Sequence, residues 1–283
     1  MTTVTLEDIP YEEPEQVNAA DCLKELDELI GLNGVKTAMH KLIDTINVQQ
    51  QIAKTTGSKT NIPIGHYMFL GNPGTGKTTV ARMMGKILYS MGAIARPDVL
   101  EVDKSQLVAG YVGQSEEKTR EAIQRAMGGI LFIDEAYELA SDQFGKNSLD
   151  ILLKQLEDKR GQFVCIVAGY TKEMQSFINS NSGLASRFPS RNCITFEDYD
   201  PKELYDIFKL FCSKEHLSID PDAETVVKEK IQLMYQNRDS KFGNARDVRN
   251  LFDSIKMNQS SRISKVSDAS LSELTTIKAE DVL

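Results

Sequence analysis

The stretch GNPGTGKT, residues 71–78, carries the strongest structural information in this chain. It matches the pattern G-x-x-x-x-G-K-[ST] in full, and it stands between the apolar segment HYMFL (66–70) and a segment of helical spacing that continues to about Tyr89. A strand, a glycine-rich turn and a helix in that order are the context that this motif requires. The glycines let backbone N–H groups turn inwards around phosphate oxygens, and the helix directs its positive end at them. The stretch therefore predicts a phosphate-binding loop in an α/β fold, with Lys77 reaching the β- and γ-phosphates and the Thr78 hydroxyl holding Mg²⁺.

A pair of acidic residues follows another apolar segment. The segment ILFIDE (130–135) ends in Asp134 and Glu135. A continuous apolar run is typical of a strand covered on both faces, and ligands of open parallel sheets bind beyond the carboxyl ends of the strands. We therefore expect Asp134 to bind Mg²⁺ through water, and Glu135 to polarise the attacking water as a general base. A protein that only held a nucleotide would not need the second carboxylate.

Strands and helices are expected to alternate on both sides of these motifs. Between Leu23 and Gln51 the apolar spacing predicts two helices joined by a turn at IGLNG (30–34), and a polar linker follows at 54–63. Further strands are predicted at 99–102, 129–133, 163–168 and 192–196, and further helices at 116–127, 147–158 and 172–179. Such an alternation predicts a parallel sheet flanked by helices.

The C-terminal part has a different character. After Asp200 three amphipathic helical segments follow with no further strand, at 201–217, 222–236 and 245–259, and residues 277–283 favour one more short helix. The first residues of the chain are acidic and show no periodicity. We therefore divide the chain into a flexible acidic tail (1–21), an α/β nucleotide-binding domain (22–199) and a helical domain (200–283).

Composition and charge restrict the classes of protein to which the chain can belong. Of its 283 residues, 41% are hydrophobic and 26% are charged, which is typical of a globular protein with a core. The net charge of -8 disfavours a broad affinity for nucleic acid or anionic membranes. No apolar run approaches the roughly 18 residues of a membrane span, and the first residues do not resemble a signal peptide. Four cysteines without a C-x-x-C pair favour a reducing compartment, so we expect a cytoplasmic protein.

Beyond these motifs the sequence resembles the AAA+ ATPases, and among them the CbbX/CfxQ group. The resemblance is carried by GNPGTGKTTVAR (71–82), AMGGILFIDEAYEL (126–139), VAGY (167–170), SGLASRF (182–188) and FGNARDVRNLFD (242–253). The group also contains stage V sporulation protein K and the ATPase module of some type VII secretion factors. The resemblance implies an AAA+ core with a C-terminal helical lid subdomain, ATP and Mg²⁺ as cofactors, and a homo-oligomeric ring that we expect to be a hexamer.

The roles of the family transfer to positions where the motifs match. The turn Ile30-Gly31-Leu32 resembles the segment that lies against adenine. Arg187 resembles the arginine finger that reaches the γ-phosphate held by a neighbouring subunit, with Arg191 as the alternative. Arg246 resembles the lid arginine called sensor 2, with Arg249, one turn further on, as the alternative. Ordinary surface charge is the competing interpretation for these arginines.

The predicted site residues fall into three sets. The residues expected to contact the nucleotide are Gly71, Asn72, Pro73, Gly74, Thr75, Gly76, Lys77, Thr78, Thr79, Ile30, Gly31, Leu32 and Arg246. The residues expected to act in catalysis are Lys77, Glu135, Arg187 and Arg246. The residues expected to hold Mg²⁺ are Thr78 and Asp134.

One position departs from the general superfamily pattern. A polar residue, often asparagine, usually ends the strand after the acidic pair, whereas this strand ends in Ala168 and Gly169, followed by Tyr170 and Thr171. The CbbX-like group shares this departure, so the resemblance to ATPases stands. Tyr170 and Thr171 are the candidates for the side chain that senses the γ-phosphate.

The stretch AGYVGQSE (109–116) places an aromatic and an aliphatic side chain on a glycine-flanked turn. In the AAA+ layout this loop points into the central channel of a ring, and Tyr111, Val112 and Gly113 are then a pore loop that grips an extended polypeptide. Apolar grip needs no matching charge, which suits an acidic protein. The alternative is that Tyr111 and Val112 pack beneath a neighbouring helix.

Two hypotheses of function follow. The first is a ring-forming Mg-ATP hydrolase that remodels a protein partner through its pore loops. Activation of Rubisco is the most specific function known in the group. The second is a nucleotide-dependent assembly switch or scaffold of a secretion or sporulation system, in which nothing is threaded. No nucleic-acid partner and no membrane span are expected.

Overall fold

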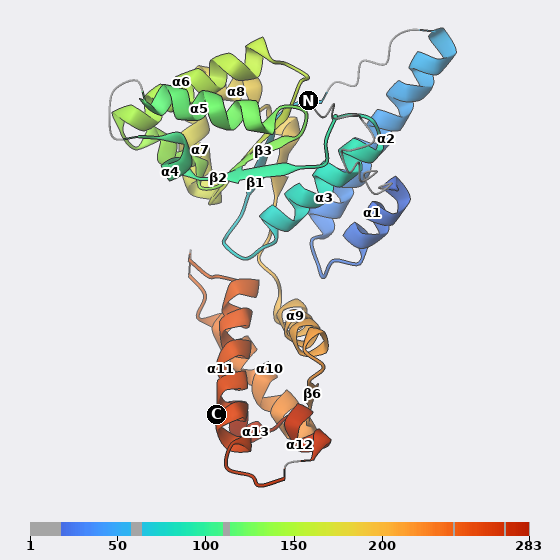
Figure 1. Cartoon of the computed structure of the whole chain (residues 1–283), viewed down its shortest axis with the longest axis vertical. Coiled ribbons are helices and arrows are strands. Elements are labelled where there is room, and N and C mark those ends of the chain that lie inside the picture. The colour runs from blue at the N-terminus through green and yellow to red at the C-terminus, as the bar shows by residue number, and fades with distance from the viewer. Residues whose placement is uncertain (1–17, 58–63, 110–113, 240, 269, 283) are drawn as a thin grey trace, which may run out of the picture.

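The computed structural model of this chain describes residues 18–57, 64–109, 114–239, 241–268 and 270–282. Figure 1 shows an α/β part that holds the sheet, and the C-terminal helices gathered beyond it. In the first part the elements are α1 (Ala19–Asp27), α2 (Asn33–Thr56), β1 (Tyr67–Leu70), α3 (Lys77–Ser90), β2 (Val99–Val102), α4 (Lys104–Leu107), α5 (Gln114–Ala126), β3 (Ile130–Ile133), η2 (Ala136–Ala140), α6 (Gln143–Asp158), β4 (Val164–Gly169), α7 (Thr171–Asn179), α8 (Ser182–Arg187), η3 (Ser190–Asn192) and β5 (Cys193–Thr195). In the second part they are α9 (Pro201–Lys214), β6 (Ser218–Ile219), α10 (Pro221–Gln236), α11 (Ala245–Ile263), α12 (Leu271–Thr275), β7 (Thr276–Ile277) and α13 (Ala279–Val282).

The main sheet is parallel, as the alternation of strands and helices predicts. Its strand order is β2-β3-β4-β1-β5, so the central strand β4 lies between β3 and β1. In register, Phe69 of β1 lies opposite Ala168 of β4 on one side and Ile194 of β5 on the other. Because all strands run in one direction, the residues that follow β1, β3 and β4 meet at one edge of the sheet.

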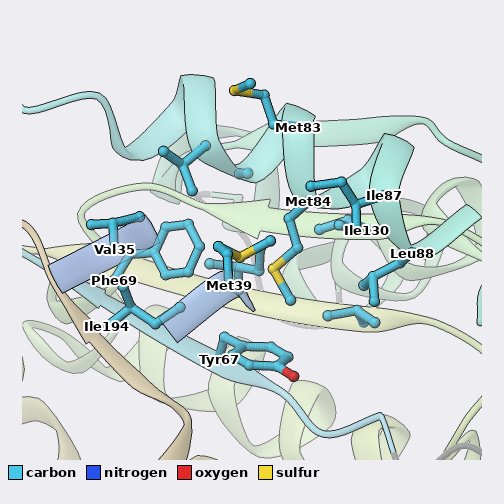
Figure 2. Packing of buried hydrophobic residues seen from close by; sticks show 14 of the residues in the cluster. Val35, Met39, Tyr67, Phe69, Met83, Met84, Ile87, Leu88, Ile130 and Ile194 are labelled. Atoms are coloured by element: carbon cyan, nitrogen blue, oxygen red, sulfur yellow. The ribbon is translucent and has the colours of Figure 1, made fainter. Parts of the chain in front are cut away.

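Side chains of β1 alternate between two cores, one on each face of the sheet. Tyr67 and Phe69 face a core shared with α1, α2 and α3, whereas Met68 and Leu70 face a core shared with α5, α6 and α7. Figure 2 shows Met84 of α3 directed towards this first face of the sheet. Burial on both faces is the physical reason for the continuous apolar run of β1.

The C-terminal part has a separate core. The rings of Phe208 on α9 and Phe252 on α11 meet edge to face with centroids 5.8 Å apart, and Ile277 is fully buried with them. The expectation that strands stop after Asp200 is wrong, because β6 and β7 pair in parallel through Ser218 and Ile219. Two-residue strands carry too little alternation to be recognised from sequence.

Several boundaries differ from the sequence-based prediction. Residues 19–21, assigned to the tail, form the first turn of α1, because the side chain of Asn18 accepts a hydrogen bond from the Ala20 N–H and caps the helix. Helix α2 continues to Thr56, three residues into the predicted linker. Helix α6 begins four residues earlier than predicted, where Asp142 caps it by accepting from the Gly145 N–H at 2.8 Å.

None of the helices in the described ranges is both long enough and apolar enough to cross a membrane.

A buried histidine, His66, fixes the start of β1 to β4. The Cys165 N–H donates to its Nδ1 at 3.0 Å, so this nitrogen carries no proton. Burial lowers the pKa of His66 to about 4. Protonation would convert an acceptor into a donor that faces another donor.

This geometry predicts a loss of stability in mild acid. The unfolded chain, with an imidazole pKa of about 6.5, takes up the proton before the folded chain does. The contribution of His66 is therefore complete above about pH 6.5 and is lost progressively as the pH falls towards 4. Urea unfolding at pH 7 and pH 5 should show the parent protein losing about 2 kcal/mol more than the His66→Asn variant between the two pH values. Parallel pH dependences for parent and variant would contradict this assignment.

Candidate active site

The glycine-rich turn follows β1 at the edge where the strands end. Its backbone takes the left-handed region at Gly74 (φ 68°) and Gly76 (φ 93°), which non-glycine residues rarely adopt. Lys77 begins α3 and its ammonium donates to the carbonyls of Gly71 at 2.9 Å and Asn72 at 2.8 Å. The turn therefore wraps around the lysine, and the N-terminal end of α3 faces the same space.

Burial lowers the pKa of Lys77, while the nearby carboxylates of Asp134 and Glu135 act in the opposite direction. Desolvation disfavours the charged ammonium, and opposite charges favour it. This places a partly desolvated cation beside two acids at one edge of the sheet. An additional anionic group at this place would be attracted to the ammonium.

The acidic pair follows β3, the second strand from β1 in the sheet. The Asp134 carboxylate accepts from the N–H of Glu135 at 3.0 Å, and Glu135 has a left-handed backbone with φ 47°. Partial desolvation and the neighbouring carboxylates of Glu138 and Asp134 raise the pKa of Glu135. Left-handed non-glycine residues and carboxyl groups with raised pKa values are both common at functional sites. Glu135 has both properties.

A cleft of about 520 Å³ lies over these residues, between the α/β part and the C-terminal helices. Part of its lining is apolar and comes from Leu29, Ile30, Leu32, Ile207, Leu210 and Phe211. Another part is polar and comes from Lys77, Thr78, Thr79, Asp134, Glu135 and Arg246. A lining of both kinds suits a ligand that combines an apolar ring with several negative charges.

The C-terminal helices reach the glycine-rich turn through Asn244, which is fully buried and has φ 49°. Its amide donates to the carboxylate of Asp198 at 2.8 Å, and Asp198 accepts from the side chain of Asn72 at 3.0 Å. The Ala245 N–H donates directly to the Gly74 carbonyl at 3.2 Å. Asp198 and Asn244 therefore join the two parts of the molecule. Neither role follows from the sequence pattern, although Asn244 lies within the FGNAR segment (242–246).

Most of the residues predicted for the site line the cleft. They are Ile30, Leu32, Gly71, Pro73, Gly74, Gly76, Lys77, Thr78, Thr79, Asp134, Glu135 and Arg246, together with the alternatives Arg249 and Tyr170. The two lid arginines differ in their surroundings. The Arg249 guanidinium lies 3.8 Å from the ring centroid of Phe211, whereas Arg246 makes no side-chain hydrogen bond or ion pair in the described part of the chain.

Other predicted residues lie beside the cleft without lining it. The side-chain amide of Asn72 donates a hydrogen bond to the carboxylate of Asp198. The buried Thr75 hydroxyl donates to the Asn72 carbonyl at 2.8 Å. At Gly31 (φ 61°) an added Cβ would lie 2.5 Å from the carboxylate of Glu203, so this glycine allows the close approach of α9. Thr171 begins α7 and is absent from the lining residues.

The two candidate finger arginines also lie outside the cleft. Arg187 ends α8, and its guanidinium lies 3.6 Å from the carboxylate of Glu157 on α6. Its Nε is buried and finds no hydrogen-bond partner among the described residues. Arg191 is exposed in η3. The predicted pore loop, Tyr111, Val112 and Gly113, lies outside the described residues.

Two family models match the chain. Residues 67–196 match the ATPase family associated with various cellular activities (AAA), and residues 200–283 match the AAA lid domain.

The chain is also similar to several characterised proteins along most of its length. It is 40% identical to the chloroplastic ribulose bisphosphate carboxylase/oxygenase activase of Cyanidioschyzon merolae, over 95% of this chain and 92% of that protein. It is 38% identical to stage V sporulation protein K of Bacillus subtilis, over 92% and 81% of the two chains. It is 36% identical to the protein CbbX of Cereibacter sphaeroides, over 95% and 88% of the two chains.

Among solved structures, the fold is similar to that of the FIGL-1 AAA domain in complex with ADP. The TM-score is 0.61 at 16% identity, with 90% of this chain and 80% of that chain covered. At this identity the likeness concerns the fold alone.

Two glycines with left-handed backbones allow a matched test of how the C-terminal helices dock. A Cβ on Gly74 would lie 2.0 Å from the Gly243 carbonyl oxygen, whereas at Gly57 (φ 63°) it would meet nothing within 4 Å. Alanine in this backbone region costs about 1–2 kcal/mol at either position. Only Gly74→Ala should also push the helices away from the turn, so its affinity for a fluorescent ATP analogue should fall on the order of tenfold or more.

The control variant, Gly57→Ala, should bind the analogue as the parent does while its melting temperature falls by a few degrees. Equal affinities of the Gly57→Ala and Gly74→Ala variants would show that contact between the lid and the turn is unimportant for binding.

Proposed function

The chain belongs to the AAA family of ATPases, in the group that includes the CbbX and CfxQ proteins, and we propose that it forms a ring that uses Mg²⁺ and ATP to remodel a protein partner. The proposal rests chiefly on the cleft between the glycine-rich turn and the lid. Its apolar lining, with Ile30 and Leu32, suits adenine, and its polar lining, with Lys77 at the start of α3, suits the phosphates. In this arrangement the lid closes the cleft and supplies Arg246 to the phosphate end.

The residues present fit a magnesium ion at the phosphate end. Thr78 and Asp134 both line this part of the cleft and offer hydroxyl and carboxylate oxygens. Mg²⁺ prefers oxygen ligands, keeps several waters, and is commonly held by one or two protein groups together with the substrate phosphates. Groups of three or more His, Cys, Asp or Glu side chains that could hold a metal are absent from the described ranges, which agrees with a sparse site of this kind. When bound, the ion would neutralise charge that develops on the phosphates.

Glu135 is the residue we assign as the general base. Glu135 lines the same cleft as Lys77, and its raised pKa makes it a better proton acceptor than an ordinary glutamate. Arg246 is preferred to Arg249 as the lid arginine, because the guanidinium of Arg249 is already stacked on Phe211. An arginine without such a partner in the described structure is available to contact a phosphate.

A ring is supported by the position of Arg187. This side chain does not line the cleft of its own chain, so it reaches a phosphate only if a second subunit brings its cleft to α8. Pairing with Glu157 holds the guanidinium near the surface, with about a quarter of the side chain exposed. We assign Arg187 as the finger that acts on a neighbouring subunit, and the resemblance to AAA+ rings favours a hexamer.

Action in trans predicts that two inactive variants restore each other. Arg187→Ala subunits keep an intact cleft but lack the finger, and Lys77→Ala subunits lack nucleotide binding but keep the finger. ATPase activity of the mixture should therefore exceed that of either variant alone, and the specific activity of the parent should rise with protein concentration as rings form. A mixture no more active than its components, with subunit exchange demonstrated by light scattering of the separate and mixed species, would rule out a finger in trans.

A protein partner is supported by the relatives, one of which is an activase of another protein, ribulose bisphosphate carboxylase/oxygenase. In this chain we assign the grip on the partner to Tyr111, which lies outside the described residues. An assembly switch of the sporulation type is the competing function, since stage V sporulation protein K is similarly close. A switch does not thread a polypeptide and has no need of an aromatic side chain at position 111.

The two functions differ in how β-casein, which is extended in solution, should affect ATP hydrolysis. If Tyr111 grips extended chains, β-casein should stimulate the ATPase rate of the parent and of Tyr111→Phe, because the aromatic ring supplies the contact. The rate of Tyr111→Ala should not respond, although its melting temperature stays that of the parent. A parent rate that β-casein leaves unchanged would favour the switch. A fall in melting temperature of Tyr111→Ala, equivalent to about 3–5 kcal/mol, would instead make Tyr111 a core residue.

A further inference from the structure

The arginine assigned as the finger, Arg187, is folded back along its own helix. Gly183 lies one turn before it in α8, and an added Cβ on Gly183 would lie 3.8 Å from Nη1 of Arg187. Helical side chains incline towards the N-terminal end of their helix, so they cover the residue about four positions earlier. Because Gly183 has only a hydrogen at this place, the guanidinium lies close against α8.

Helix α6 supplies an acid on the other side of the guanidinium. Helix α8 packs against α6 (Figure 1), and the same added Cβ on Gly183 would lie 3.2 Å from Cδ1 of Leu153 on α6. Leu153 and Leu184 of α8 are buried in one core. One turn after Leu153, the carboxylate of Glu157 lies 3.6 Å from Nη2 of Arg187. The close packing of the two helices therefore places Glu157 beside the finger.

This folded position does not satisfy the guanidinium. An arginine side chain carries five N–H donors, and the Nε donor of Arg187 is buried with no hydrogen-bond partner among the described residues. A buried donor without an acceptor is unfavourable, whereas the same donor is satisfied in water or against a phosphate. The separation of 3.6 Å from Glu157 is longer than a hydrogen bond, and about half of the Glu157 side chain is exposed. Attraction between two charges therefore holds the finger in place, without a full set of hydrogen bonds.

We infer that Glu157 restrains the finger: its carboxylate holds Arg187 against α8 and competes for the guanidinium with a nucleotide phosphate in the neighbouring subunit. The inference rests on the proposed action of Arg187 in trans. A terminal phosphate carries more negative charge than one carboxylate and accepts bidentate hydrogen bonds from arginine, so it displaces Glu157 when a neighbour brings its occupied cleft to α8. A single subunit therefore keeps its finger withdrawn.

The restraint can be tested because finger and cleft come from different subunits. In a mixture of Lys77→Ala and Arg187→Ala chains, only the Lys77→Ala chain supplies a finger. Adding Glu157→Gln to that chain should raise the ATPase rate of the mixture about two- to fivefold, the range that one half-exposed ion pair supports. Adding Glu157→Gln to the Arg187→Ala chain should leave the rate unchanged, because that chain has no finger to release.

The matched control is Asp158→Asn, placed in the Lys77→Ala chain. It removes the same charge from the same end of α6, one residue further along, and should not change the rate of the mixture. In the otherwise unchanged protein, Glu157→Gln should raise kcat by a similar factor. KM for ATP and the affinity for ADP should stay at the parent values, because Arg187 does not line the cleft of its own chain.

Results against the restraint differ from results against the finger itself. An unchanged or lower rate with Glu157→Gln in the chain that supplies the finger would overturn the inference. An equal rise in both arrangements, or a similar rise with Asp158→Asn, would overturn it as well, because the effect would then be one of overall charge or of folding. A mixture of Lys77→Ala and Arg187→Ala that stays inactive although its subunits exchange would instead overturn the finger in trans.

Discussion

The close approach of the lid to the glycine-rich turn is the constraint on which the candidate site depends. At Gly74 the backbone of the lid comes so near that a single Cβ would collide with the Gly243 carbonyl. A direct hydrogen bond from Ala245 and the bridge from Asn72 through Asp198 to Asn244 hold this approach. Without it the cleft would lack the wall that carries Phe211 and Arg246. The cleft is therefore a product of two folded parts and belongs to neither alone.

Burial also sets the electrostatics of the site. Desolvation lowers the pKa of the Lys77 ammonium, while the acidic pair opposes the change. Glu135 experiences the converse effect, because desolvation and two neighbouring carboxylates disfavour its charge. Hydrolysis needs a proton acceptor near a group that attracts phosphates. Glu135, with its raised pKa, and the Lys77 ammonium line the same cleft. The left-handed backbone of Glu135 indicates that the surrounding structure imposes its orientation.

What the chain contributes to its own site can be separated from what a neighbour would contribute. Lys77, Asp134, Glu135 and Arg246 line one cleft in a single chain. Arg187 lies elsewhere, on α8, where Glu157 neutralises part of its charge. If Arg187 acts on a neighbouring subunit, as we propose, hydrolysis depends on assembly and ATP consumption is coupled to the geometry of a ring. Within the chain, the ring of Tyr137 packs against Gly169 at the end of β4.

The fold class and the polar residues of the cleft could be predicted from the sequence. Glycines at fixed spacing between a strand and a helix permit few conformations, and continuous apolar runs place Asp134 and Glu135 at the end of a buried strand, so local physical rules were enough. The docking of the lid and the packing of the aromatic rings could not be predicted in this way. Asp198 and Asn244 are 46 residues apart in the chain, and Tyr137 meets Gly169 across two strands, so no local pattern shows these contacts. The difference is physical: periodicity and turn chemistry act within a few residues, whereas lid docking and ring packing depend on distant segments that meet only when the chain has folded.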